Sequence, residues 1–486
     1  MKLVASSSLT RLIFGSICAV SLSSCGGGGS SSPSAGPTNQ PPVATAPSFS
    51  SAATVAIVEN TANGFYTAAA TDPQGDAITF SVFAGPDAGS FVMENGGVLR
   101  FNEPPNYDLP SDVDGNNIYE VTLRATAGGE SDDLALRVTV TNDREGVVVT
   151  RVATGFVDPV AISFVHNEPT LLVAEAGGAV KAFDPDTGTI TEDTFIRDNK
   201  VAGEIIAMAY GFPGNFYQEG TYILTHSPQD GLFLQAFKAD ANRIGRQRLG
   251  DPWATPTTAS IIANGSMFIA IGSPEEGDAQ DASSPYGKLI ELETFDPYSG
   301  ASLPSPNVLV FRSSIIGDGV QRPGGFSPEF GRIYLADQGS SLEHEISIFQ
   351  TDWRPLDFGW PFYEGSQSTR VNPPAQINGP TLTYTVGSGP KEGSGVIAGL
   401  MNDENFFPAL GRSYIFADTS GTIWSVPYST IIDGFRHDAR DFEIRNEDFA
   451  PDQGTIDSPV GFTIGFGSSH FYILDSDGEI FRVGQS

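Results

Sequence analysis

The chain has 486 residues, and its 40% hydrophobic and 17% charged residues are typical of a globular protein with two or three domains. Its formal net charge of −32 repels nucleic acid and anionic lipid headgroups, which excludes a nucleic-acid-binding function, whereas neutral ligands and divalent cations suit such a surface. The 55 Gly and 34 Pro residues, together with the lack of long helical periodicity, predict an all-β protein with many turns.

Residues 1–24 have the pattern of a targeting segment. Lys2 and Arg11 supply positive charge, and the apolar run that follows is too short to span a membrane stably. The run ends in LSSC, which resembles the cleavage box of bacterial lipoproteins, and that resemblance implies a lipid on the Cys25 thiol. Gly26, where an Asp would imply inner-membrane retention, then implies anchoring in the outer membrane, with the protein periplasmic or surface-exposed. An ordinary signal peptide with an incidental Cys is the alternative.

Two segments of different character follow the targeting segment. Residues 25–47 are rich in Gly and Ser and then in Pro, with too few apolar residues to fold, so we expect a tether. Residues 48–145 contain short strand-like runs separated by Gly, Pro and Asp, which predicts an antiparallel β-sandwich. The runs are TVAIVEN from Thr54, AITFSVF from Ala77, VLRFN from Val98, IYEVTLRATA from Ile118 and LALRVTVTND from Leu134.

This unit resembles a bacterial cadherin-like repeat, an immunoglobulin-like sandwich. The resemblance rests on VEN from Val58, TDPQGDAITFSV from Thr71, VLRFNEPPNYDLPSDVDGNNIYEVTLRAT from Val98 and the closing VTVTND. It implies calcium bound at the ends of the unit by hard oxygen ligands, and calcium-dependent adhesion to a protein partner. The carried-over candidate ligands are Glu59, Asp72, Asp76, Asp108 and Asp143. The alternative is that these acids only cap turns.

Residues 146–486 repeat one pattern six times: an apolar run, acidic or small residues, Gly, and a second apolar run. Each copy predicts two adjacent β-strands, and a spacing of roughly 40 to 60 residues predicts blades of about four strands around a channel. The copies begin at Glu168, Glu219, Asn264, Phe330, Gly411 and Ser468. The predicted fold class is therefore all-β, a cadherin-like sandwich followed by a six-bladed β-propeller.

The propeller resembles the glucose/sorbosone dehydrogenase family of soluble six-bladed sugar dehydrogenases. The resemblance rests on VATGFVDPVAISFVHNEPTLLVAEAGGAVKAF from Val152, GEIIAMAYGFPGNF from Gly203, AQDASSPYGKLIELE from Ala279, the segment from Arg322 through GWPFYEGS, and GRSYIFADTSGTIW from Gly411. It implies pyrroloquinoline quinone (PQQ) and calcium as cofactors, and a sugar or related alcohol as substrate.

The resemblance also implies a catalytic base, because a family His at the start of a His-Asn-Gly-Gly strand removes the hydroxyl proton while hydride passes to the quinone. The corresponding stretch, residues 251–273, contains no His. A general base must titrate near the working pH, so we take His226 and His344 as candidate substitutes. His226 lies at the end of a predicted strand of the second blade, and His344 lies between two Glu residues. An ordinary turn or surface role is the alternative for both.

A set of cofactor contacts is implied in the same way. Arg322 offers a planar fork that matches a carboxylate, and Trp360 offers an aromatic face for a sugar ring. The carried-over candidates are Gln280, Asp281, Lys288, Arg322 and Trp360, and bracing of blades or loops is their alternative role.

Three interpretations of function remain open. The first is a membrane-anchored PQQ-dependent sugar dehydrogenase with a displaced base. The second is a non-catalytic surface lipoprotein that binds glycans or proteins through the propeller and the cadherin-like domain. The third is a lactonase-type hydrolase with a metal held by channel carboxylates. The sequence has no G-x-S-x-G, HExxH or phosphate-binding loop that would support other enzyme classes.

Overall fold

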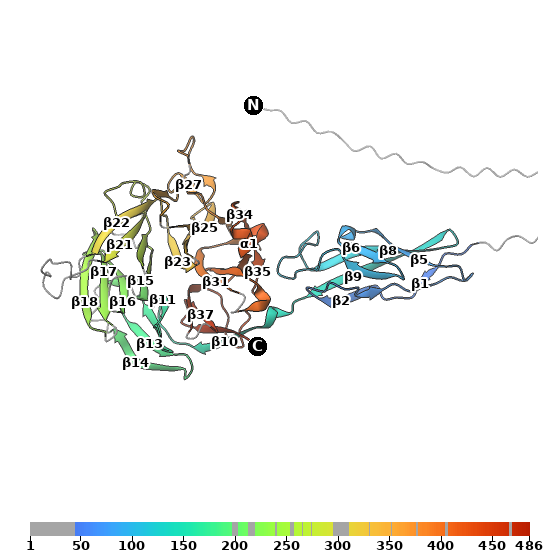
Figure 1. Cartoon of the computed structure of the whole chain (residues 1–486), viewed down its shortest axis with the longest axis horizontal. Coiled ribbons are helices and arrows are strands. Elements are labelled where there is room, and N and C mark those ends of the chain that lie inside the picture. Colours follow the sequence, from blue (N-terminus) through green and yellow to red (C-terminus); the bar gives the residue numbers. More distant parts are fainter. Residues whose placement is uncertain are drawn as a thin grey trace, which may run out of the picture.

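A computed structural model describes residues 44–486 except 197–202, 212–218, 239–240, 253–256, 265, 274, 295–310, 330, 351, 376–377, 404–406 and 466–468. These residues form a β-sandwich followed by a β-propeller (Figure 1). Within the described ranges, no helix is long and apolar enough to cross a membrane. The predicted lipidation residue, Cys25, lies outside the described residues.

The sandwich packs a four-stranded sheet, β2-β9-β8-β5, against a three-stranded sheet, β3-β7-β6. Alternate residues of β8 and β9 face inward, so that Tyr119, Leu123 and Val138 are buried against Leu99 and Phe101. Each of the five predicted runs contains a strand. The bounds are β1 (Ser48–Phe49), β2 (Thr54–Val58), β3 (Tyr66–Thr67), β4 (Ala70–Thr71), β5 (Thr79–Ala84), β6 (Phe91–Glu94), β7 (Val98–Phe101), β8 (Ile118–Ala127) and β9 (Glu130–Thr141).

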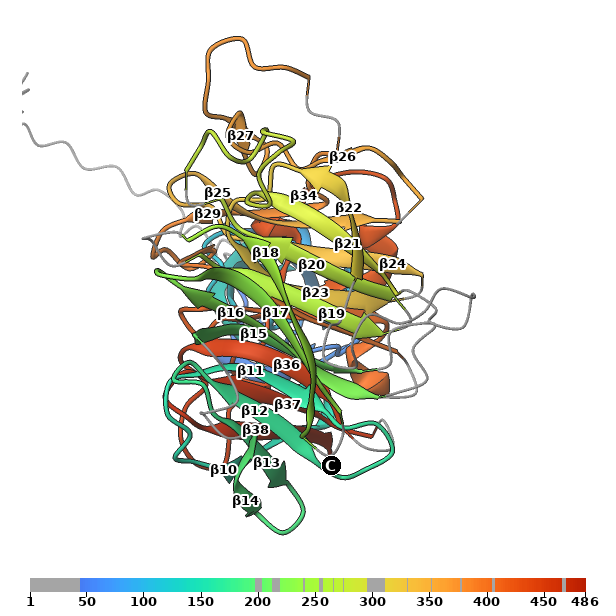
Figure 2. The ribbon, with the colours of Figure 1, turned by 90° about the vertical axis from the view of Figure 1, so that its left-hand side faces the viewer.

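Six sheets of the propeller surround a central axis (Figures 1 and 2). Blade 1 contains β11 (Pro159–Phe164), β12 (Leu171–Glu175), β13 (Val180–Asp184) and β14 (Thr189–Ile196), and blade 2 contains β15 (Glu204–Gly211), β16 (Gly220–Ser227), β17 (Gly231–Lys238) and β18 (Arg243–Gly250). Blade 3 contains β19 (Ala259–Asn264), β20 (Ser266–Ile271), β21 (Lys288–Thr294), β22 (Phe311–Asp318) and β26 (Leu356–Asp357). Blade 4 contains β23 (Pro323–Glu329), β24 (Arg332–Asp337), β25 (Glu343–Phe349), β29 (Leu382–Val386), β30 (Glu392–Gly393) and β34 (His437–Asp438).

The remaining blades complete the ring. Blade 5 contains β31 (Val396–Asn402), β32 (Ser413–Asp418), β33 (Ile423–Pro427) and β35 (Glu443–Ile444), and blade 6 contains β36 (Pro459–Ile464), β37 (Phe471–Asp475), β38 (Ile480–Gln485) and β10 (Val147–Ala153). A small hairpin, β27 (Tyr363–Glu364) and β28 (Gln367–Ser368), projects from the loops, and the helix α1 (Tyr428–Ile431) follows β33.

Blade 6 closes the ring because it combines both ends of the propeller sequence. β10 pairs antiparallel with β38, from Val147 opposite Gln485 to Ala153 opposite Ile480. The first strands of the six blades contact one another in order, and β36 contacts β11. The predicted six-bladed propeller is thus confirmed, and the six sequence copies are the second and third strands of the six blades.

The second strand of most blades is buried on both faces between its neighbours. β12 (LLVAE), β32 (SYIFAD) and β37 (FYILD) are buried throughout. A strand with two covered faces needs a continuous apolar run, whereas a half-exposed strand alternates. This explains why the repeat was visible in the sequence as runs of Leu, Ile, Phe and Tyr.

An acid at the end of the second strand joins each of four blades to its own first strand. Asp418 accepts hydrogen bonds from the backbone N–H groups of Ser394, Gly395 and Ser420, each at 3.0 Å or less, and from the Tyr384 hydroxyl at 2.7 Å. Glu175, Asp337 and Asp475 hold the corresponding loops of blades 1, 4 and 6. Ladder pairing places His226 at this position in blade 2 and Ile271 in blade 3.

We therefore expect Asp418→Ala to destabilise the propeller by roughly 3 kcal/mol, because it leaves several buried donors without an acceptor. Chemical denaturation followed by far-ultraviolet circular dichroism measures this loss. Asp352→Ala, at an exposed Asp of the same domain, is the matched control and should change stability by less than about 0.5 kcal/mol. Equal effects of the two substitutions would contradict the bracing role.

Candidate functional site

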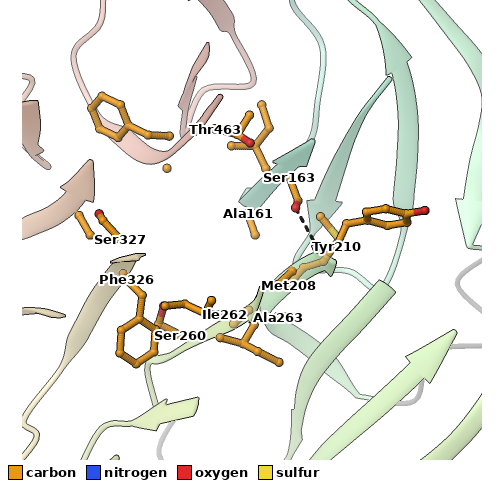
Figure 3. A pocket seen from close by; sticks show the side chains of 18 of the residues that line it. Ala161, Ser163, Met208, Tyr210, Ser260, Ile262, Ala263, Phe326, Ser327 and Thr463 are labelled. Carbon is orange, nitrogen blue, oxygen red and sulfur yellow. Dashed lines mark hydrogen bonds between the residues drawn. The ribbon is translucent and has the colours of Figure 1, made fainter. Parts of the chain in front are cut away.

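The six first strands enclose a channel of about 930 Å³ along the propeller axis (Figure 3). We call the end where these strands begin the near mouth and the end where they finish the far mouth. The wall between the mouths consists mostly of small and apolar residues, including Ala161, Met208, Ile262, Gly325 and Ala398. Such a wall offers little to hold a polar ligand.

Hydroxyl groups of the channel wall are used between blades. Ser163 Oγ accepts the Tyr210 backbone N–H at 2.9 Å, and Thr463 Oγ1 accepts the Phe164 N–H at 3.1 Å. Ser327 Oγ donates to the carbonyl of Gly399 at 2.5 Å. These bonds tie one first strand to the next, so the hydroxyls stabilise the ring.

Ionisable side chains of the described lining lie at the two mouths. Glu204 begins β15 at the near mouth, while His166, Glu219 and Glu329 lie at the far mouth. Burial raises the pKa of Glu329 to about 7, although the Met401 N–H donates to it at 3.3 Å. No Lys or Arg occurs among the described residues that line the channel. Sequence reasoning singled out neither Glu329 nor His166, although both lie within segments that resemble the sugar dehydrogenase family.

His226, the first candidate base, is buried within blade 2. Its side chain lies opposite Glu204 in the ladder, its residue exposure is 2%, and it is not part of the channel lining. It occupies the repeat position at which four other blades carry a bracing acid. His226 therefore lies inside the blade and away from the channel.

His344, the second candidate base, is fully buried in β25. Its Nε2 lies 3.1 Å from the Gly393 carbonyl, and its ring packs on Tyr384 with centroids 4.9 Å apart. Burial lowers the pKa of His344, so the ring is neutral near pH 7. It does not line the channel either, and neither candidate base faces a channel-bound alcohol.

Four of the five predicted cofactor contacts come together at the near mouth, beside blades 3 and 4. Gln280 Nε2 donates to the Trp360 backbone carbonyl at 2.9 Å, and the Trp360 backbone N–H donates to the Gly319 carbonyl at 3.1 Å. Lys288 and Arg322 lie on either side of the Gly319 loop. The structure therefore assembles the motif residues that lie far apart in the sequence.

The charged groups of this set are engaged by the protein itself. Lys288 Nζ is fully buried and donates to the carbonyls of Asp278 and Ala279 at 2.8 and 2.7 Å, with Asp318 at 3.4 Å. Burial lowers the pKa of Lys288, partly offset by Asp318. The Arg322 guanidinium donates to the carbonyls of Gln338 and Gly339.

Asp281, the fifth member of the set, caps a turn. Its carboxylate accepts the backbone N–H and the hydroxyl of Ser283, both at 2.8 Å. These bonds lower the pKa of Asp281. The side chain is exposed, and the turn-capping role explains it.

Next to Trp360 lies a group of carboxyls that the sequence analysis did not predict. Asp337 and Glu345 face each other across the β24–β25 ladder and are both buried. Burial raises the pKa of Asp337 to about 7 and that of Glu345 well above its usual range. Burial would also raise the pKa of Glu364, but hydrogen bonds from Ser340 and its neighbours outweigh it and lower the pKa.

The carboxyl group of Glu345 and the Trp360 indole line a cavity of about 10 Å³. Glu345 Oε2 and Trp360 Nε1 have no hydrogen-bond partner in the described protein. A cavity of this size has room for one water molecule at most, and none for a sugar or a quinone. Ligand binding at this mouth is therefore confined to the outer surface of the loops.

These residues do not fit PQQ. The quinone carries three carboxylates, and a protein binds such a group with cations that are free to pair with it. The described channel lining has neither Lys nor Arg, Lys288 is buried beneath the loop, and the Arg322 guanidinium is bonded to two carbonyls. The near mouth thus contains the residues of the predicted cofactor site, but Lys288 and Arg322 already donate to protein carbonyls.

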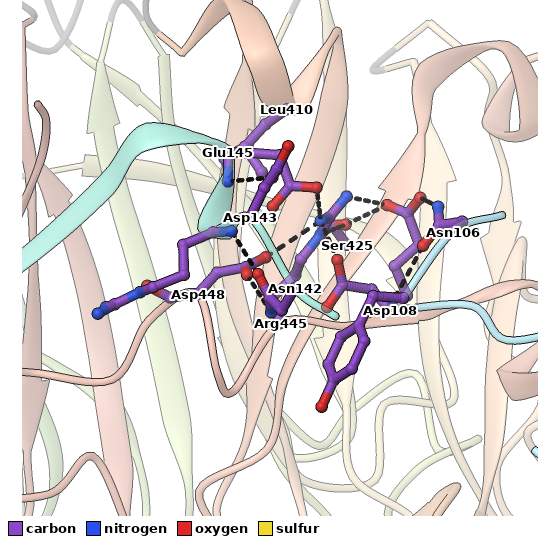
Figure 4. A network of polar contacts seen from close by, with 12 residues as sticks. Asn106, Asp108, Asn142, Asp143, Glu145, Leu410, Ser425, Arg445 and Asp448 are labelled. Atoms are coloured by element: carbon purple, nitrogen blue, oxygen red, sulfur yellow. Dashed lines mark hydrogen bonds and ion pairs between the residues drawn. The ribbon is translucent and has the colours of Figure 1, made fainter. Parts of the chain in front are cut away.

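The predicted calcium ligands divide between the two ends of the sandwich. Asp72 and Asp76 lie near the β8–β9 turn, where Asp72 accepts the Gln74 N–H at 2.9 Å. Glu59, Asp108 and Asp143 lie at the opposite end, against blade 5 of the propeller (Figure 4). The structure therefore brings three of the five together.

At that end, Glu145 joins the group, although no motif indicated it. One carboxylate oxygen from each of Glu59, Asp108 and Glu145 lies within 4.8 Å of the others. Burial raises the pKa of Asp108 to about 8 and that of Glu145 to about 9, although the Arg445 guanidinium lowers both. Burial therefore favours the protonated form of both carboxyls, and Arg445 favours the ionised form.

Comparison with known proteins adds the following. No protein-family model and no curated protein matches the chain. Among solved structures, one similar chain is a glucose dehydrogenase, at 18% identity and a TM-score of 0.49, over 70% of this chain and 100% of that chain. Another is the apo soluble aldose sugar dehydrogenase from Escherichia coli, at 15% identity and a TM-score of 0.48, over 70% of this chain and 100% of that chain. The holo PQQ domain of pyranose dehydrogenase from Coprinopsis cinerea is similar at 15% identity and a TM-score of 0.46, over 70% of this chain and 96% of that one. The propeller assignment rests on the closed ring of sheets.

The raised pKa values in blade 4 predict a loss of stability at alkaline pH. A carboxyl whose folded pKa lies above its unfolded value stabilises the fold at low pH, and that contribution is lost as pH rises through the folded pKa. Thermal unfolding midpoints should therefore fall as pH rises from about 6 to about 9. Glu345→Gln keeps the shape of the side chain without the charge, so its midpoint should exceed that of the wild type at pH 9 by roughly 3 °C and match it at pH 5.

Glu275→Gln, at an exposed Glu of the propeller, is the control and should follow the wild-type curve. Superimposed curves for all three proteins would show that Glu345 does not bind its proton more tightly in the folded state.

Proposed function

We propose that the chain is a lipid-anchored extracytoplasmic protein whose propeller binds a neutral sugar or glycan without oxidising it. The observation that carries this proposal is the burial of both candidate bases, His226 and His344, outside the channel. The channel-lining His of the described residues, His166, lies at the far mouth, one strand length away from the motif residues. A channel-lining His and the motif residues therefore do not meet at one mouth among the described residues.

The charge of the near mouth favours a neutral ligand. The chain carries a net charge of −32, and the motif cations Lys288 and Arg322 are bound to protein carbonyls. A carboxylated or phosphorylated ligand would compete with these carbonyls, whereas a sugar needs only hydrogen bonds and an aromatic surface. Trp360 is partly exposed, and Gln280 is bound to the Trp360 carbonyl.

A titration with PQQ, with and without calcium, tests the absence of the dehydrogenase reaction. We expect no change in quinone absorbance and no sugar-driven reduction, because both candidate bases are buried outside the channel and the motif cations are bonded to protein carbonyls. Calcium-dependent binding followed by reduction with an aldose would overturn the proposal. The titration uses residues 26–486, which include both domains.

A screen of immobilised neutral glycans tests the positive part of the proposal. Trp360→Ala should weaken binding of the best glycan by about tenfold, the loss expected from one aromatic contact of roughly 1.4 kcal/mol. Trp353→Ala is the matched control, because Trp353 is a 46% exposed Trp that precedes β26, away from the motif residues. No retention of any glycan, or equal losses in the two variants, would remove the support for a sugar site at this mouth.

A second candidate function is the dehydrogenase itself, and one observation favours it. Gln280, Lys288, Arg322 and Trp360 come from motifs that resemble the sugar dehydrogenase family, and they converge at one mouth. This candidate requires that the Arg322 guanidinium, which donates to the carbonyls of Gln338 and Gly339 through Nε and Nη2, also pair with a quinone carboxylate. The same PQQ titration decides between the two candidates.

We further propose that Cys25 carries the lipid anchor and that the protein resides in the outer membrane of a bacterium. The sequence LSSC at the end of the leader supports this. Metabolic labelling with a radioactive fatty acid should label the wild type, and Cys25→Ala should abolish the label and release the protein from the membrane fraction. Cys18→Ala, within the leader, is the control and should keep the label. Labelling of the Cys25 variant would contradict the anchor.

A further inference from the structure

We infer that Arg445 of the propeller takes the place of a shared calcium ion at the junction with the sandwich, so that a guanidinium locks the two domains together. This inference concerns the domain junction and is independent of the proposed ligand. It also departs from the calcium binding that the sandwich motifs imply.

The guanidinium of Arg445 lies at the centre of the acidic cluster (Figure 4). Its Nη1 lies 2.5 Å from Asp108 Oδ2, 3.0 Å from Glu145 Oε1 and 3.1 Å from Asp448 Oδ2. Its Nη2 lies 2.6 Å from Glu443 Oε2. The cation thus joins two carboxyls on the sandwich side to two on the propeller.

Blade 5 fixes Arg445 in this position. The Arg445 backbone N–H donates to the Ile423 carbonyl at 2.9 Å, and Nε donates to Ser425 Oγ at 2.9 Å. The side chain is only 5% exposed. Because the Arg445 backbone and Nε are both bonded within blade 5, the side chain loses little further conformational entropy when it pairs with the sandwich carboxyls.

A calcium ion would have to compete with the guanidinium for the same oxygens. Calcium binds oxygen ligands at about 2.3–2.6 Å. The oxygens of Asp108, Glu145 and Asp448 that face Arg445 already lie 2.5–3.1 Å from Nη1, which bears the same sign of charge as the ion.

The other predicted ligands at this end already have partners. Glu59 accepts the N–H groups of Tyr107 and Asp143 at 2.8 and 3.1 Å, and Asp143 Oδ1 accepts the Glu145 N–H at 2.8 Å. These carboxylates therefore shape the loops of the sandwich around the place where Arg445 enters.

Further contacts across the junction fix its orientation. Asn142 Nδ2 donates to Asp448 Oδ1 at 2.7 Å, and the Tyr107 hydroxyl donates to Glu447 at 2.7 Å. The Ile444 N–H donates to the carbonyl of Asp108 at 3.0 Å, so one contact is backbone to backbone. Bonds in several directions resist both bending and twisting of the sandwich relative to the propeller.

The distance between the domains tests this inference in residues 26–486, which contain no Cys. Spin labels at Asn95→Cys in the sandwich and Thr189→Cys in blade 1, both exposed positions, report the distance by pulsed electron paramagnetic resonance. We expect a narrow distribution that neither EDTA nor about 1 mM calcium changes. In Arg445→Gln the distribution should at least double in width, because the carboxyls lose their cation.

Calcium should then act on the variant and not on the wild type. Without the guanidinium, the carboxyls are free to take a metal, so calcium should narrow the Arg445→Gln distribution and raise its unfolding midpoint. Arg440→Gln is the matched control, because the Arg440 side chain is 87% exposed and pairs with Asp438 within the propeller. It should behave as the wild type does.

Two results would overturn the inference. Broadening of the wild-type distribution by EDTA would show that a metal holds the junction, and an unchanged distribution in Arg445→Gln would show that Arg445 does not. Arg445→Lys separates loss of the lock from misfolding. Its ammonium keeps the positive charge but cannot contact all four carboxyls at once. Its distribution should lie between those of the wild type and Arg445→Gln, with the circular dichroism spectrum of the folded protein.

Discussion

Pairing of β10 with β38 converts six separate sheets into one ring. The pairing joins residues more than 300 positions apart in the chain, and it makes β10 the outer strand of blade 6. It also decides where the sandwich lies. Glu145 stands two residues before the start of β10, so the strand that closes the ring necessarily places the end of the sandwich beside blades 5 and 6. The junction around Arg445 is a consequence of ring closure.

Ring closure also limits what the channel can do. Six first strands line the channel mostly with small and apolar side chains, and the hydroxyls of Ser163, Ser327 and Thr463 bond to a neighbouring first strand. Polar groups that could recognise a ligand are therefore displaced to the mouths. There, the near mouth contains long loops with Gln280, Arg322 and Trp360, whereas the far mouth contains His166 and Glu329. This separation places the motif residues and His166 at opposite ends of the channel, so the fold alone does not bring them together.

The sequence was sufficient to predict the strands, but not to predict which side chains from distant segments come into contact. Second strands such as β37 are covered on both faces, so their continuous apolar runs made the repeat visible, and the all-β fold and the six blades followed. The roles of His226 and His344 did not follow, because burial depends on which neighbouring blade covers a strand. Asp337 and Glu345 face each other only through ladder register. Arg445 meets Asp108 across 337 residues, and no local pattern in either segment signals that contact.

The junction has a physical consequence for a protein held on a tether. A calcium ion shared by two domains dissociates when the surrounding concentration falls, whereas a guanidinium is covalently part of the chain and keeps its charge at every pH that a cell surface meets. The effective concentration of Arg445 at the sandwich is set by the β10 connection, which is only a few residues long. Burial of four carboxyls around one cation would be unfavourable if all four were ionised, and burial raises the pKa of Asp108 and Glu145, which reduces the negative charge that Arg445 has to balance. A junction locked in this way would make the sandwich a stiff spacer between the tether and the propeller.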